Sequence, residues 1–290
     1  MSYFSANIKK ALKGYGFILP GFFIIISIIL YPLAKTVFLS FSKSDKTFLF
    51  TLDNYIQVMK APQFFPMLKR TLIWMIGTVF FSFIIGFGAA KLIDQPFIKG
   101  KNIWRSLLLL AWITPGVVKA QAWKWLYSSD FGMLNQMLKT MGIIDESIPW
   151  LTRSNIAFIA VLIIQVWSEF PYTMLMISAG LQSISRDHRE CALLDGANWF
   201  QYTFHIEIPL IKDIVFVAIL ISTIWAINTF SVIWIVTQGG PARATTVLSL
   251  DIYKKFLMFD LQGASATAIL QLIISLFITA FYLHRANKEN

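Results

Sequence analysis

Apolar runs of about 20 residues, the length that a helix needs to cross a bilayer, dominate the pattern along this chain. Six such runs cover residues 17–34, 71–90, 106–127, 154–185, 214–238 and 261–283. The third run contains Pro115-Gly116 and is interrupted by Lys119 and Lys124, so we expect a kink or a break within it. The pattern predicts an all-α integral membrane protein with six transmembrane helices.

Composition supports a membrane protein over a soluble one. Apolar residues make up 57% of the chain and charged residues 14%, and the mean hydropathy is +0.64. A soluble domain carries about 25% charged residues. The net charge of +10 does not indicate nucleic-acid binding, because the Lys and Arg residues flank the apolar runs and form no continuous basic stripe. The lone Cys191 excludes an internal disulfide and a multi-cysteine metal site.

The N-terminal end allows two interpretations. Lys9, Lys10 and Lys13 precede the run that begins at Phe17, as they would in a cleaved signal peptide. No small-x-small cleavage pattern follows the run, so we interpret it as an uncleaved first span. Six spans place both termini on one side of the membrane. The basic residues divide almost evenly between the two sides, and their density favours the inner side for the termini only weakly.

The loop after the fourth run has the pattern of a helix–turn–helix at the membrane surface. Residues 187–194 have helical spacing, with Asp187 as the expected N-cap. Gly196 is expected to end this helix in the left-handed conformation. Residues 198–205 predict a second short helix, and Pro209 suits the first turn of the next span. The expected apolar face of the second helix comprises Trp199, Phe200 and Phe204.

This loop resembles the "EAA" loop of binding-protein-dependent ABC importer permeases. That pattern is Glu-Ala-Ala, three residues, Gly, nine residues and Ile-x-Leu-Pro. Glu190, Ala192 and Gly196 match it, and Ile206 and Pro209 close it at the expected spacing. Cys191 and Ile208 depart from it, but both are small or apolar replacements. The alternative is an ordinary surface helical hairpin in which Gly196 only ends a helix, and the Gly-to-Pro spacing and the flanking motifs argue against it.

Further motifs resemble the maltose-type (MalF-like) sugar permeases. They are Leu181-Gln182-Ser183-Ile184, Gly239-Gly240-Pro241, Gly263-Ala264-Ser265-Ala266, and Trp167 to Tyr172 with its Phe-Pro-Tyr ending. The resemblance covers roughly residues 67–285 and implies a permease domain there, preceded by residues 1–66 and followed by a tail at 286–290. It implies that the loop faces an ATPase, so that the loop and both termini are cytoplasmic, in a bacterial or archaeal cell membrane. The residues that it places in ATPase coupling are Glu190, Ala192, Leu193, Asp195, Gly196 and Ala197.

The resemblance also implies partners. They are a second permease subunit, two ATPases and an external solute-binding protein. The chain has no Gly-x-x-x-x-Gly-Lys-Ser/Thr sequence, so we expect ATP and magnesium to bind the ATPases and not this chain. The three histidines are scattered, and we expect neither a metal nor an enzymatic activity here.

Polar residues within the fourth and fifth runs indicate a candidate solute path, because polar groups in spans tend to face the bundle interior or a water-filled cavity. The polar residues of the fourth run lie on one face of the expected helix, and the selected residues of the fifth run also lie on one face of theirs. They are Gln165, Ser168, Glu169 and Tyr172, and Trp225, Asn228 and Thr229. In MalF-like permeases the positions matching the first group line the sugar site, although Glu169 stands where a small residue is expected. The alternative is that these residues join helices to one another, or bond their own backbone.

Three other classes compete with an importer. A secondary transporter would show inverted repeats and paired intramembrane carboxylates, whereas only Glu169 lies well inside a span. A scaffolding protein would leave the loop pattern unexplained, and a membrane enzyme would need a catalytic constellation. For an importer, the sequence leaves open an oligosaccharide, a monosaccharide or a polyol phosphate such as glycerol phosphate as the solute. We expect an oligosaccharide.

Overall fold

The computed structural model describes residues 18–44 and 50–289, without the side chains of Arg186, Leu193 and residues 285–289. Lys9, Lys10, Lys13 and Phe17, on which the prediction of an uncleaved first span rests in part, lie outside the described residues. The described chain is helical apart from turns and one isolated bridge between Ser42 and Phe50. The predicted all-α class is confirmed.

Four described helices are long and apolar enough to cross a membrane. They are Ile18–Ser40, which contains η1 (Ile26–Leu30) and α2 (Tyr31–Ser40), α4 (Phe64–Asp94), α8 (Ser154–Ser183) and the Leu261–His284 part of α15 (Leu261–Glu289). Two bent pairs meet the same test. In one pair, α5 (Lys101–Ile113) and α6 (Gly116–Leu126) meet at 95°, and in the other Trp199–Leu210 and α12 (Lys212–Asn228) meet at 76°. With each bent pair counted as one span, the described chain has up to six, which is the predicted number, although the second pair begins in the predicted surface helix at 198–205 and not at 214.

The chain divides into two compact units, Met1–Phe64 with Ile252–Leu272, and Phe65–Asp251 with Ile273–Asn290. In the first unit, α3 (Asp53–Lys60) is held to the end of α2. The Asn54 side chain donates to the carbonyls of Ser40 and Ser42 at 3.0 and 2.9 Å, and the Tyr55 hydroxyl donates to the Ser40 hydroxyl at 2.8 Å. The predicted regions 1–66, 67–285 and 286–290 were defined by sequence resemblance and not by contacts, so this division stays a prediction.

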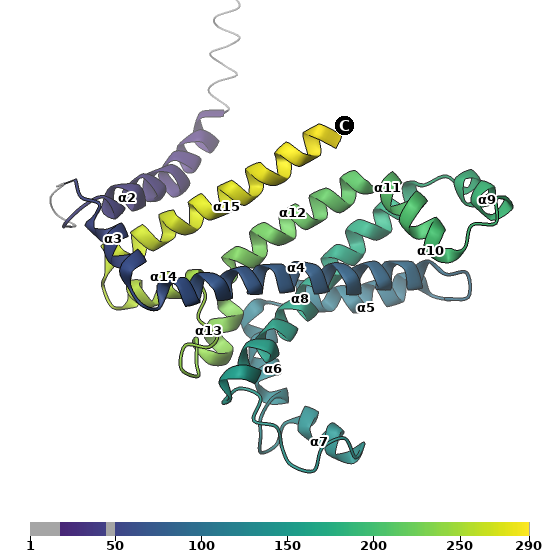
Figure 1. Ribbon diagram of the computed structural model, residues 1–290, viewed down its shortest axis with the longest axis horizontal. Coiled ribbons are helices and arrows are strands. Elements are labelled where there is room, and N and C mark those ends of the chain that lie inside the picture. The colour runs from purple at the N-terminus through teal and green to yellow at the C-terminus, as the bar shows by residue number, and fades with distance from the viewer. Residues whose placement is uncertain (1–17, 45–49, 290) are drawn as a thin grey trace, which may run out of the picture. The chain divides into compact units, whose positions relative to one another are not determined.

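Helix α8 is the centre of the second unit, and α5, α12 and α13 (Ser231–Thr237) contact it (Figure 1). Its most apolar stretch is 61% buried, whereas that of α4 is 28% buried. The core where α4, α6, α8 and α13 meet comprises Trp74, Ala120, Tyr127, Ala160, Val161, Ile164, Val232, Ile233, Val236, Val247 and Leu250. This burial pattern makes α8 the helix against which the other elements of the unit are positioned.

Helices α4 and α8 approach each other closely at Gly86. A Cβ atom at this position would lie 2.8 Å from the Phe170 carbonyl oxygen and 2.8 Å from the Met174 backbone nitrogen. Small residues permit such backbone-to-backbone contact between membrane helices. Gly86 therefore fixes the distance between α4 and the middle of α8.

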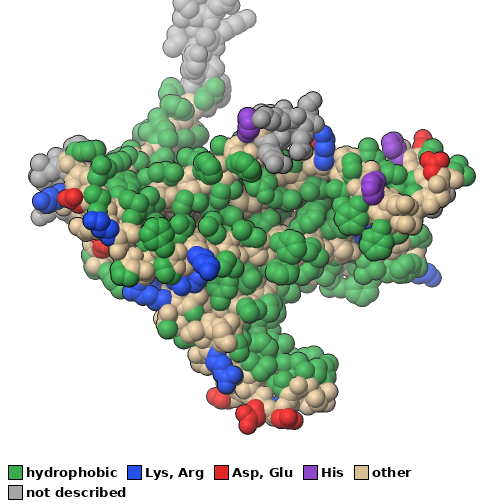
Figure 2. Space-filling model, viewed as in Figure 1, with side chains coloured by type: hydrophobic (Ala, Val, Ile, Leu, Met, Phe, Trp, Pro, Cys, Tyr) green, Lys and Arg blue, Asp and Glu red, His purple; other side chains and the backbone are tan. Residues whose placement is uncertain are grey.

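The outer face of α4 is apolar and exposed, as in Ile76, Phe80 and Ile84. Hydrophobic side chains cover most of the visible surface, while acidic side chains gather near α7 (Met133–Thr140) and near α9 (Arg186–Leu194) (Figure 2). In a soluble protein an exposed apolar surface of this extent would favour aggregation. In a bilayer it is the surface that lipid covers.

The predicted fifth span, 214–238, is wrong as a single helix. Helix α12 ends at Asn228, and α13 begins at Ser231. The Asn228 and Thr229 side chains donate to the carbonyls of Ile224 and Trp225, and the Ser249 hydroxyl donates to the Thr229 carbonyl at 2.5 Å. Side chains that bond backbone carbonyls compete with helix continuation, which explains why the predicted run did not give one helix. The break predicted at Pro115-Gly116 is confirmed, because α5 ends at Ile113 and α6 begins at Gly116.

Candidate functional site

A cavity of about 440 Å³ lies where the two helix breaks of the second unit meet. Its lining residues come from α5, α6, α8 and the α12–α13 segment. They are Trp112, Thr114, Gly116, Lys119, Gln165, Asn228, Thr229, Phe230, Ser231 and Val232. We call this space the polar cavity. Irregular backbone at membrane depth is tolerated where it lines a water-filled cavity, and transporter sites form at such discontinuous helices.

The first break exposes backbone to the cavity because of Pro115. Proline has no backbone N–H to bond the preceding turn, and it favours an extended residue before it. Thr114 accordingly has ψ 130°, and its hydroxyl donates to the Leu110 carbonyl at 2.6 Å. Helix α6 then starts again at Gly116, where a Cβ atom would lie 3.1 Å from the Ser231 hydroxyl oxygen. The break thus brings α6 directly against the start of α13.

Three of the predicted path residues, Gln165, Asn228 and Thr229, line the polar cavity. The Gln165 amide donates to Glu169 at 3.1 Å. Glu169 is only 3% exposed. Gln165 therefore connects the cavity wall to a buried acidic group in the next turn of α8.

The other predicted path residues do not line this cavity. The Ser168 hydroxyl donates to the Ile164 carbonyl at 2.8 Å, so it is satisfied by its own helix. Tyr172 and Trp225 lie with ring centroids 4.6 Å apart, and Trp112 contacts both rings at 5.8 and 6.3 Å. Trp112 also lines the cavity, so this aromatic cluster lies beside the polar groups.

Sequence reasoning missed seven lining residues, and four of these have side chains that can hydrogen-bond: Trp112, Thr114, Lys119 and Ser231. Lys119 interacts electrostatically with Glu169, although 50 positions separate them in the sequence. The sequence did contain an indication of the role of Lys119. A charged residue inside an apolar run is energetically costly and tends to face a cavity. The sequence placed this lysine at a break but could not show which helix it would face.

The polar cavity combines hydrogen-bonding side chains with aromatic rings. The Gln165 and Asn228 amides both donate and accept, and Thr114 and Ser231 offer hydroxyls. The adjacent rings of Trp112, Tyr172 and Trp225 provide flat apolar surfaces against which C–H groups pack.

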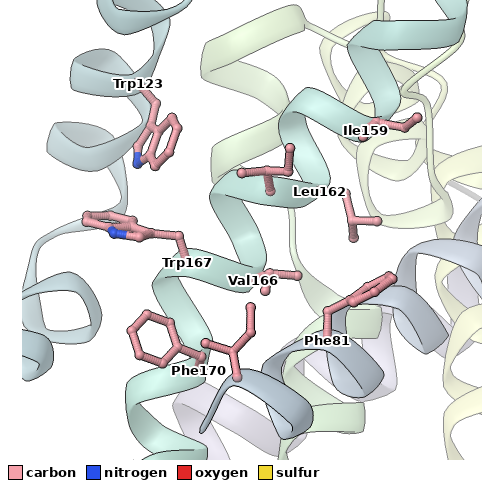
Figure 3. A pocket seen from close by; sticks show the side chains of 9 residues that line it. Phe81, Trp123, Ile159, Leu162, Val166, Trp167 and Phe170 are labelled. Atoms are coloured by element: carbon pink, nitrogen blue, oxygen red, sulfur yellow. The ribbon is translucent and has the colours of Figure 1, made fainter. Parts of the chain in front are cut away.

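A second cavity, of about 450 Å³, lies on the opposite face of α8 (Figure 3). Every lining side chain is apolar or aromatic: Phe81, Ile85, Trp123, Ile159, Leu162, Ile163, Val166, Trp167 and Phe170. We call this space the apolar cavity. It has no carboxylate, amide or hydroxyl side chain to match a polar solute.

The loop between α8 and α12 has the predicted turn. Helix α9 ends at Leu194, and Gly196 has φ +74°, in the left-handed region. The Ala197 N–H donates to the Ala192 carbonyl at 2.9 Å, which is the bond that closes a Schellman motif. The chain then enters α10 (Trp199–Gln201) through a capping box between Asn198 and Gln201.

Two details of the loop differ from the prediction. Helix α9 begins at Arg186, so Asp187 lies in its first turn, where a carboxylate still favours the helix dipole, and is not the cap. Pro209 lies in the short helix α11 (Ile208–Leu210), and Ile211 separates it from α12. Between α10 and α11 the chain forms a π-helix, η2 (Tyr202–Glu207).

The predicted coupling residues differ in exposure. Glu190, Asp195 and Gly196 are exposed, Ala197 is half-buried, and Ala192 is buried. The Leu193 side chain lies outside the described residues. Trp199, Phe200 and Phe204 of the next helical segment are also exposed. The Phe200 ring meets Trp199 edge to face and lies parallel to Phe204. This end of the second unit therefore presents an apolar and acidic surface.

Two named relatives are similar in sequence to nearly the whole chain. The trehalose/maltose transport system permease protein MalF of Thermococcus litoralis is 32% identical over 95% of this chain and 94% of its own length. The sulfoquinovosyl glycerol transport system permease protein SmoG of Agrobacterium fabrum is 32% identical over 91% of this chain and 87% of its own length.

Solved structures agree on the fold. A chain of a bacterial ABC transporter involved in import of the acidic polysaccharide alginate matches with a TM-score of 0.86 at 21% identity, over 98% of both chains. A chain of a bacterial alginate transporter in complex with an alginate pentasaccharide-bound periplasmic protein matches with a TM-score of 0.83 at 20% identity, over 98% of this chain and 96% of that one. The family model described as the binding-protein-dependent transport system inner membrane component matches residues 16–288. The chain belongs to this family of membrane-embedded importer permeases.

Proposed function

We propose that the polar cavity is the point at which a carbohydrate, an oligosaccharide in the first instance, crosses this importer permease. The observation that carries the proposal is the convergence of Gln165, Asn228 and Lys119 with the aromatic Trp112 at the two helix breaks. One relative is named as a trehalose/maltose permease and another as a sulfoquinovosyl glycerol permease, and both names support a sugar-like solute.

The proposed transporter contains more than this chain. A second permease subunit completes the membrane path, and two ATPases bind ATP and Mg²⁺ and close on the loop between α8 and α12. An external solute-binding protein delivers the solute, as the periplasmic protein bound to the alginate importer suggests. The loop and both chain termini then lie on the cytoplasmic side of a bacterial or archaeal cell membrane.

Purification of this chain from its native membrane in mild detergent tests the assembly. We expect a soluble ATPase and a second multi-span protein to copurify with it. The complex is then reconstituted in proteoliposomes with the solute-binding protein, and ATP-dependent uptake of labelled di- and oligosaccharides is measured. Isolation of a lone homodimer without ATPase would overturn the proposal.

A polyol phosphate is the second candidate solute, and Lys119 is the observation that favours it. An ammonium group lining the cavity would attract a phosphate. The two candidates differ in which labelled solute is taken up with ATP. Labelled maltose or trehalose is taken up if the solute is a sugar, whereas labelled glycerol phosphate is taken up if the solute is a polyol phosphate.

In the proposed mechanism, ATPase closure moves the segment that contains Glu190, Ala192, Leu193, Asp195, Gly196 and Ala197, and the movement changes access to the cavity. Gly196→Val tests the turn, because a β-branched residue at φ +74° is strained by about 1–2 kcal/mol. We expect ATP-dependent uptake to fall while the protein still inserts into the membrane. Gly142→Val is the matched control, since Gly142 has φ +69° and open space like Gly196 but lies in the connection between α7 and α8.

A further inference from the structure

One buried ion pair joins the loop to a helix that is not its neighbour in the sequence. Lys91 lies in the last turns of α4, and Glu207 ends η2. The Lys91 ammonium nitrogen lies 2.5 Å from a Glu207 carboxylate oxygen, and the side chains are only 12% and 9% exposed. The α8–α12 loop, which the chain connects only to α8 and α12, is thereby also attached to α4.

The Lys91 ammonium has aromatic neighbours as well as the carboxylate. It lies 5.6 Å from the ring centroid of Trp199 and 5.7 Å from that of Tyr202. Both distances fall within the range of a cation–π interaction. Since Trp199 is in α10 and Tyr202 and Glu207 bound η2, the lysine contacts both ends of the segment 199–207.

The burial of this pair distinguishes it from an ordinary surface ion pair. Lys101 and Asp94, near the same end of α4, lie 4.0 Å apart with side chains 34% and 50% exposed. An exposed pair of that kind contributes little, whereas loss of one partner of a buried pair leaves an uncompensated charge. Lys91 and Glu207 therefore form a specific attachment, and Lys101 supplies a built-in control.

The attachment gives the loop a second connection to the polar cavity. Helix α4 meets α8 backbone to backbone at Gly86, and α8 carries Gln165 in the cavity wall. Displacement of residues 199–207 thus acts on α8 through its own chain connection and also through α4.

We propose that Lys91 and Glu207 are positioning residues that tie α4 to the coupling loop, so that ATPase closure moves α4 together with α8 and α12. The inference rests on the proposed function of the loop. It assigns a role to Glu207, which occupies the variable position of the Ile-x-Ile-Pro sequence, and to Lys91, which lies outside every motif.

The test measures solute transported per ATP hydrolysed in the reconstituted transporter. We expect Lys91→Met to lower this ratio by roughly tenfold, within the range of a coupling interaction, while ATP hydrolysis persists. The exchanged pair Lys91→Glu with Glu207→Lys restores opposite charges and should recover at least half of the ratio. Lys101→Met should match the wild type.

A wild-type ratio in Lys91→Met, or an equal loss in Lys101→Met, would overturn the inference. Where Lys91→Met does not fold, the double variant Lys91→Ala with Glu207→Ala replaces it, because it leaves no unpaired buried charge. Normal coupling in that double variant would also overturn the inference, since the tie is then dispensable.

Thermal unfolding of the permease in detergent separates this inference from the proposed function. A double-mutant cycle over Lys91 and Glu207 should show that the two melting shifts are not additive. If the reconstituted wild-type transporter shows no ATP-driven sugar uptake, the proposed function is overturned. Additive melting shifts would overturn the tie itself, whatever the solute.

Discussion

The polar and the apolar cavity have nearly equal volumes, about 440 and 450 Å³, and both use α8 as a wall. To the polar cavity α8 contributes Gln165, whereas six of its side chains, from Ile159 to Phe170, line the apolar cavity at spacings of three and four residues. Size therefore does not mark the candidate route for solute. Hydrogen-bonding groups and broken helices distinguish the candidate route, because a polar solute that leaves water needs protein groups to replace its hydrogen bonds to water.

The apolar cavity has a different physical character. Its walls come from the uninterrupted helices α4 and α8 and from Trp123 of α6. Its lining side chains carry no hydroxyl, amide or carboxylate, and the indole N–H groups of Trp123 and Trp167 are their only hydrogen-bonding groups. The two faces of α8 thus separate a surface that suits solute from a surface that suits apolar groups.

The largest expected effect comes from placing a charge in the apolar cavity. Val166→Asp should lower the stability of the protein by about 2.5–3.5 kcal/mol, because no partner for a carboxylate lines that space. The measurement is the folded fraction in detergent by size-exclusion chromatography and thermal unfolding. Asn228→Asp places the same group in the polar cavity, and we expect a smaller loss. Equal losses in the two variants would remove the distinction between the cavities.

A medium effect is expected from separating α4 and α8. Gly86→Ala introduces a methyl group 2.8 Å from backbone atoms of Phe170 and Met174, and overpacking of this kind costs about 1–3 kcal/mol. Thermal unfolding should show the loss. Gly88→Ala is the matched control, because nothing lies within 4 Å of its Cβ position. If the Gly86→Ala protein is as stable as the control, α4 can move away from α8 at little cost. The part of the apolar cavity that Phe81 and Phe170 line would then not be rigid.

The smallest effect is expected from removing one hydrogen-bonding group from the polar cavity. Gln165→Leu should raise the solute concentration for half-maximal uptake by about threefold to tenfold, equivalent to one lost hydrogen bond of 0.5–1.5 kcal/mol. Val166→Leu, at a residue that lines the apolar cavity, should leave this concentration unchanged. If the Val166 variant shifts it as much as the Gln165 variant does, the solute does not pass on the polar side.

The local features of this protein were predictable from its sequence. The break at Pro115, the left-handed Gly196 and the all-helical class each depend on residues within a few positions of one another. The predicted helical face containing Gln165 and Glu169 is also local, and the two side chains bond one another at 3.1 Å. The hydrophobic pattern failed to predict the end of the helix at Asn228. There a hydrogen bond from Ser249 to the Thr229 carbonyl, 20 positions apart in the sequence, acts together with local side-chain bonds to end the helix.

Only the tertiary structure decided which of these features meet. Lys119 joins Gln165 and Asn228 in one cavity because two separate breaks pack against each other and against α8. Lys91 reaches Glu207 across 116 positions because α4 and the α8–α12 loop lie side by side at one end of the unit. Hydrophobic period and turn residues determine single helices, whereas contacts between helices depend on how all of their faces pack at once. The sequence by itself therefore determined the membrane helices, except where the fifth is broken after Asn228, and the turn of the loop. The tertiary structure determined the cavity and the attachment between loop and helix.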